Sequence, residues 1–102
     1  MCSFGDASAN HSTAQGAFNT AQWTAYQNTP LPLLFVCEDN GLGISVRTPA
    51  GWVQSAYGNR PHLRYEFVDG TDPEAVLHTS RDLGDWVRTT LPAVLRTNSM
   101  VR

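Results

Sequence analysis

The sequence LLFVCEDNGLG at residues 33–43 is the strongest indicator of the architecture of this chain. Residues 33–37 form a continuous apolar run, which is typical of a strand that is covered on both faces and lies parallel to its neighbours. Polar and small residues follow from Glu38 onward, so oxygen ligands and permissive backbone come where the strand ends. The segment therefore predicts a buried strand that runs directly into a polar loop.

A helix is expected before this strand, and another strand before that helix. Residues 1–4 have the character of the end of a strand and run into a Gly-Asp turn. Ser12 and Gln15 have the spacing of a capping box with Ser12 as the N-cap. Small and apolar residues then recur at helical spacing as far as about Gln27, namely Ala14, Phe18, Ala21 and Ala25. The prolines at positions 30 and 32 end this helix before the apolar strand begins.

The second half of the chain predicts further elements of the same two kinds. Residues 63, 65 and 67 are apolar or aromatic and alternate with charged residues, which predicts a strand. Asp72 followed by Pro73 is a typical helix start, and apolar spacing continues that helix to about Thr89. Residues 93–95 predict a last short strand, while residues 52–53 indicate at most a short helix. This alternation predicts an α/β fold with a parallel sheet and flanking helices.

Two polar motifs lie at expected strand ends, GDASAN at residues 5–10 and EDNGLGIS at residues 38–45. Asp6 offers a carboxylate and Asn40 an amide oxygen, and both ligand types suit Mg²⁺. A right-handed crossover brings the carboxyl ends of both strands to the same edge of the sheet. Backbone amides around Ala7 and Ser8 would then hold phosphate oxygens, and a backbone carbonyl just past Asn40 would be a third metal ligand. The residues themselves therefore predict a metal-diphosphate site.

Composition limits the alternatives. The 102 residues are enough for one small domain, with 41% hydrophobic and 16% charged residues and no sign of disorder. A formal charge of −2 argues against nucleic acid or an anionic membrane as the main partner. No apolar run is long enough to span a bilayer. Cys2 and Cys37 lack disulfide or zinc spacing, so we expect free buried thiols and a cytoplasmic location.

Four blocks of the sequence together resemble a known family. They are FGDASAN at residues 4–10, LFVCEDNG at residues 34–41, GIS at residues 43–45 and VDGTD at residues 68–72. Gly-Asp-Gly followed some thirty residues later by Asn is the thiamine diphosphate (ThDP) signature of transketolase-like enzymes. The chain most closely resembles the alpha-type half of the E1 component of 2-oxo acid dehydrogenase complexes. This resemblance implies a single, incomplete transketolase-like ThDP-binding domain over residues 1–102.

The resemblance also implies seven cofactor-binding residues, which are Gly5, Asp6, Ala7, Ser8, Asn40, Leu42 and Ile44. Asp6 and Asn40 match the Mg²⁺ ligands of the family. Leu42 matches the position that donates a backbone carbonyl to the metal, and Ile44 the apolar position against the thiazolium ring.

The match departs from the family pattern at two points. Ala7 stands where the family has its second glycine, which matters only if the backbone there needs a positive φ. Asp6 and Asn40 are 34 positions apart, a few more than usual, and we assign the extra length to the turn at residues 28–32.

The resemblance implies partners as well as residues. The family's cofactor-activating glutamate lies on a separate domain or subunit, and its histidine-containing loop lies beyond the last strand. We therefore expect a complementary E1 domain or beta-type subunit, a lipoyl-bearing E2 protein and a 2-oxo acid substrate. The chain resembles the middle of a cofactor domain, which is the pattern of a fragment or a split-gene product, and the isolated chain is expected to be inactive.

Two other function classes stay open at this point. One is a different ThDP enzyme, transketolase-like or acetoin-cleaving, because substrate specificity lies outside this chain. The other is a non-catalytic remnant of a gene. Smaller alternatives concern single residues. His11 is expected to be a solvated turn residue rather than a helix cap or a phosphate ligand, and Glu38 with Asp39 forms an acidic pair for which the chain offers little room for a sugar cleft.

Overall fold

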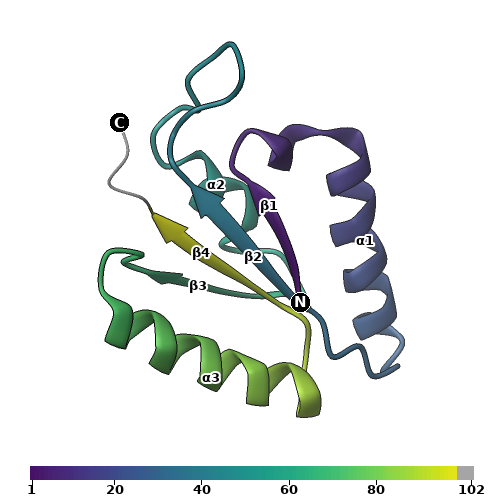
Figure 1. Ribbon diagram of the computed structural model, residues 1–102. Coiled ribbons are helices and arrows are strands. Elements are labelled where there is room, and N and C mark those ends of the chain that lie inside the picture. Colours follow the sequence, from purple (N-terminus) through teal and green to yellow (C-terminus); the bar gives the residue numbers. More distant parts are fainter. Residues whose placement is uncertain (99–102) are drawn as a thin grey trace.

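The computed structural model describes residues 1–98 and shows four strands joined by helices (Figure 1). The strands are β1 (Cys2–Gly5), β2 (Leu34–Asp39), β3 (Arg64–Val68) and β4 (Ala93–Asn98). The helices are α1 (Ser12–Tyr26), α2 (Trp52–Tyr57) and α3 (Pro73–Thr89), and a short 3₁₀ turn, η1 (Ser8–Asn10), precedes α1.

The sheet has the order β1-β2-β4-β3 and every pair is parallel. The predicted α/β fold with a parallel sheet and flanking helices is therefore confirmed. In the register of β1 against β2, Gly5 lies opposite Glu38. Because the two strands run in the same direction, the residues that follow them emerge at the same edge of the sheet, and α1 is the crossover between them.

Apolar side chains cover both faces of the sheet, as expected for parallel strands. One cluster lies on the side of α1 and α2 and includes Phe18, Phe35 and Tyr57. The other lies on the side of α3 and includes Leu83 and Leu95. Helices on both faces leave the loops at the carboxyl ends of β1 and β2 free to form a site (Figure 1).

The start of α1 differs from the predicted capping box. His11, not Ser12, is the N-cap, and its Nδ1 accepts a hydrogen bond of 3.1 Å from the backbone N–H of Thr13. His11 has the extended backbone of a cap residue (φ −70°, ψ 141°), whereas Ser12 is already helical. The expectation of a solvated turn histidine is therefore wrong, because the imidazole satisfies a helix N–H group that has no partner within the helix.

Other local predictions have mixed outcomes. Asp72 caps α3 as predicted, since its side chain accepts a hydrogen bond of 3.1 Å from the backbone N–H of Ala75. Cys37 is a free buried thiol, but Cys2 is exposed because it lies at the beginning of an edge strand, so the prediction of burial is wrong there. Within residues 1–98, no helix is long and apolar enough to cross a membrane.

Candidate functional site

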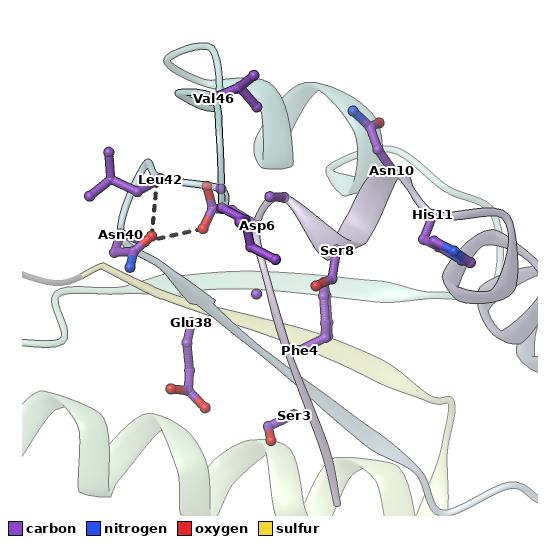
Figure 2. A pocket seen from close by; sticks show the side chains of 14 residues that line it. Ser3, Phe4, Asp6, Ser8, Asn10, His11, Glu38, Asn40, Leu42 and Val46 are labelled. Atoms are coloured by element: carbon purple, nitrogen blue, oxygen red, sulfur yellow. Dashed lines mark hydrogen bonds between the residues drawn. The ribbon is translucent and has the colours of Figure 1, made fainter.

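Asp6 and Asn40 meet at the edge of the sheet where β1 and β2 end. Asp6 is almost fully buried, with 1% of its surface exposed. Its Oδ1 accepts a hydrogen bond of 3.3 Å from the backbone N–H of Asn40 (Figure 2). The two residues that the sequence singled out, 34 positions apart, are therefore in direct contact.

The second carboxylate oxygen of Asp6 is in an unusual position. Oδ2 is buried and has no hydrogen-bond partner. A buried anionic oxygen without a partner is costly, and a bound cation is the group that most directly offsets this cost. The amide oxygen of Asn40 accepts a bond of 2.9 Å from the N–H of Leu42, which leaves its second lone pair for another ligand.

This donor set fits Mg²⁺ better than a softer metal. Within residues 1–98 no three His, Cys, Asp or Glu side chains gather as a metal cluster, so a cation beside Asp6 would take amide, backbone and ligand oxygens. Such a mixed oxygen set with a single carboxylate is usual for Mg²⁺ that also binds phosphates. The residues present are therefore compatible with a Mg²⁺-diphosphate group.

All seven site residues implied by the family resemblance line one open pocket of about 1070 Å³. A volume of this size is comparable with the ~300–1,000 Å³ of typical small-molecule sites. Seven further residues line it that the sequence did not single out as ligands: Ser3, Phe4, Asn10, His11, Glu38, Gly43 and Val46. Most of these are neighbours of the two motifs, so proximity in sequence was the available signal.

The loop that follows Asn40 folds back tightly towards Asp6. The N–H of Gly43 donates to the carbonyl of Val46 at 2.7 Å, and the N–H of Thr48 donates to the carbonyl of Gly41 at 3.0 Å. A Cβ atom at position 43 would lie 3.1 Å from the Cβ of Ala7, so glycine allows the close approach of the two motifs. Ile44 at the tip is fully exposed on the rim of the pocket.

The replacement of the family's second glycine by Ala7 is accommodated without strain. Ala7 has φ −71° and ψ −36°, the right-handed helical region that any residue adopts. The η1 turn then continues with bonds from Asn10 N–H to the Ala7 carbonyl and from His11 N–H to the Ser8 carbonyl. A compact turn therefore follows the buried carboxylate directly.

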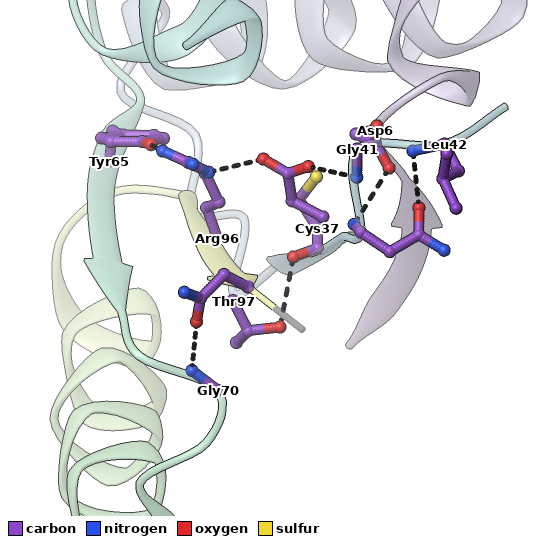
Figure 3. A network of polar contacts seen from close by, with 11 residues as sticks. Asp6, Cys37, Gly41, Leu42, Tyr65, Gly70, Arg96 and Thr97 are labelled. Atoms are coloured by element: carbon purple, nitrogen blue, oxygen red, sulfur yellow. Dashed lines mark hydrogen bonds and ion pairs between the residues drawn. The ribbon is translucent and has the colours of Figure 1, made fainter. Parts of the chain in front are cut away.

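A second polar network lies on the other side of Asn40 (Figure 3). Asp39 Oδ2 accepts a charged bond of 2.8 Å from Arg96 Nε, and both side chains are largely buried. Its other oxygen, Oδ1, accepts a bond from the N–H of Gly41 at 3.1 Å. Asp39 therefore holds the beginning of the loop against β4, and it is not available as a partner of Glu38 in an acidic catalytic pair.

Cys37 lies in β2 close to these carboxylates and is chemically inert. Burial, followed by the negative charges of Asp39 and Asp6, raises its pKa from 9.0 to about 12. Its thiol therefore stays protonated near neutral pH, where a nucleophilic or metal-binding thiol would need to ionise.

Comparison with known proteins identifies the family. The sequence matches the family model of the dehydrogenase E1 component over residues 1–99. The chain belongs to this family. The match agrees with the sequence resemblance to E1 components of ThDP-dependent 2-oxo acid dehydrogenases, which is an enzyme-component family. A comparison with curated proteins finds no match.

Proposed function

We propose that this chain supplies the Mg²⁺- and diphosphate-binding part of a ThDP-dependent 2-oxo acid dehydrogenase E1 component. The observation that carries the proposal is the buried Asp6 carboxylate, which contacts Asn40 through Oδ1 and has no partner at Oδ2. A purely structural aspartate would have both oxygens satisfied in the fold. Membership of the E1 family supports the same interpretation.

Each residue has a definite role in this proposal. Asp6 and the side-chain oxygen of Asn40 bind Mg²⁺, together with the backbone carbonyl of Leu42. The backbone at Gly5, Ala7 and Ser8 lies against the diphosphate, where small residues let the main chain approach closely. Ile44 offers an apolar surface on the pocket rim to the thiazolium ring.

The cofactor would supply the electron sink for decarboxylation of a 2-oxo acid, with the acyl group passing to a lipoyl group. The protein residues bind and orient it. Besides Asp6, the titratable side chains lining the pocket are His11 and Glu38. His11 already caps α1, and Glu38 points away from Asp6 (Figure 2). We infer that a complementary domain or beta-type subunit supplies proton transfer, and that a lipoyl-bearing E2 protein takes the product.

The test compares the purified chain with the chain assembled with a complementary beta-type E1 subunit. We expect no CO₂ release from pyruvate or branched 2-oxo acids by the chain alone, and Mg²⁺- and ThDP-dependent release by the assembly. Asn40→Ala should abolish the activity of the assembly. An isolated chain that releases CO₂ steadily, with the release lost in Asn40→Ala, would contradict the proposed division of labour. An assembly equally active without Asn40 would contradict the site.

A further inference from the structure

The turn that follows Asp6 is held from behind by a buried hydrogen-bond network. The carbonyl of Ala9 accepts two bonds of 2.7 Å, one from the hydroxyl of Tyr57 and one from Nε2 of Gln15. Nε2 of Gln15 also donates to the hydroxyl of Tyr57 at 2.7 Å. Ala9 and Tyr57 are both fully buried. The η1 turn is therefore connected at its centre to α1 and α2.

Arg60 fixes the orientation of this network. Its guanidinium donates one hydrogen bond to Oε1 of Gln15 and another to the backbone carbonyl of Ala56, and it lies 4.6 Å from the centre of the Tyr57 ring. Because a guanidinium has only donors, the amide oxygen of Gln15 must face it. The amide nitrogen then faces Ala9 and Tyr57, where both of its protons find acceptors.

Protonation of Tyr57 completes the arrangement. Burial raises the pKa of its hydroxyl, and the positive charge of Arg60 offsets only part of this effect. The hydroxyl therefore keeps its proton and donates it to the Ala9 carbonyl across a wide pH range. Tyr57 also packs on Phe18 and Phe4, with ring centres 4.7 and 6.4 Å away, so its hydroxyl has little freedom to move.

We propose that Tyr57, Gln15 and Arg60 are positioning residues that hold the turn at residues 7–10 in the shape that receives the diphosphate. This inference rests on the proposed function, since the same turn carries the backbone at Ala7 and Ser8. None of the three side chains lines the pocket. They act through the Ala9 carbonyl, which lies between the pocket-lining residues Ser8 and Asn10.

The test uses Tyr57→Phe, which removes one of the two bonds to Ala9 and keeps the aromatic ring. Loss of one such bond should make the amide protons of Asn10 and His11 exchange roughly threefold to tenfold faster, while amides of α3 keep their rates. In the chain assembled with a beta-type E1 subunit, the affinity for ThDP with Mg²⁺, measured by calorimetry, should fall by a similar factor of roughly threefold to tenfold. Tyr26→Phe is the matched control, because that side chain is 73% exposed, and it should change neither quantity.

A second variant keeps the test valid if Tyr57→Phe folds poorly. Gln15→Met removes both donors of the amide and is expected to have at least as large an effect on the same two amides. Unchanged exchange at Asn10 and His11 in both variants would overturn the inference, as would faster exchange with unchanged cofactor affinity. A wild-type assembly that binds no ThDP would instead refute the proposed function, and the inference with it, even if the exchange rates respond as expected.

Discussion

Replacing Asp6 with asparagine should stabilise the metal-free chain and abolish Mg²⁺-dependent diphosphate binding. Asp6 is 1% exposed, one carboxylate oxygen accepts a bond of 3.3 Å from Asn40, and the other has no partner. An amide of the same shape keeps an acceptor for the Asn40 N–H and removes the buried negative charge. A residue kept for structure alone would behave in the opposite way.

The expected size follows from these contacts. A buried polar atom without a partner costs roughly 1–3 kcal/mol, and more when it is charged. The amide nitrogen introduced by Asp6→Asn would lack acceptors in its turn, which cancels part of the gain. We therefore expect the free energy of unfolding of the metal-free chain to rise by about 1 kcal/mol.

The assay is urea denaturation of the purified chain in the presence of a chelator, followed by calorimetric titration of ThDP and Mg²⁺ into the chain assembled with a beta-type subunit. Asp85→Asn is the control, because that carboxylate is 81% exposed and its loss should change the free energy of unfolding by less than about 0.5 kcal/mol. The reasoning is refuted if Asp6→Asn lowers the stability of the metal-free chain, or if it binds the cofactor as tightly as the wild type.

Two further predictions concern the neighbouring network. Arg96→Met should lower the free energy of unfolding by about 3 kcal/mol in urea denaturation, because it leaves the largely buried Asp39 carboxylate without its partner. Arg88→Met in an exposed pair should cost less than about 1 kcal/mol, and equal losses in the two variants would contradict this account. At pH 8 a thiol reagent should modify Cys2 at once and the native Cys37 about a thousandfold more slowly, since the pKa of the latter is raised from 9.0 to about 12. Because the folded pKa is the higher one, the stabilising contribution of this thiol is complete below pH 9 and is lost as the pH rises towards about 12, which denaturation at increasing pH would detect. Equal modification rates for both thiols in the native chain would show that Cys37 is accessible.

The sequence was sufficient for the parts of this structure that depend on local pattern. The apolar run at residues 33–37 predicted a strand inside a parallel sheet, and β2 pairs with a parallel strand on each side. Asp72 and Pro73 predicted the start of α3. These signals are strong because each depends on residues that are close together in the chain.

Contacts between distant parts of the chain were not predictable in the same way. Capping of α1 by His11 was missed, because Ser12 and Gln15 match the capping pattern while Gln15 is instead drawn to Ala9 and Tyr57 by tertiary packing. The ion pair of Asp39 with Arg96 joins residues 57 positions apart, and only the register of β2 against β4 brings them together.

The most direct test of the metal-diphosphate site is the location of a bound cation. Mn²⁺ replaces Mg²⁺ in oxygen sites and can be located in a crystal by its anomalous scattering. In crystals of the chain assembled with a beta-type subunit and grown with ThDP, we predict one Mn²⁺ bound by Asp6 Oδ2, the side-chain oxygen of Asn40 and a diphosphate oxygen. A cofactor bound in the assembly with its Mn²⁺ elsewhere, or with Asp6 Oδ2 not among the ligands, would contradict the account.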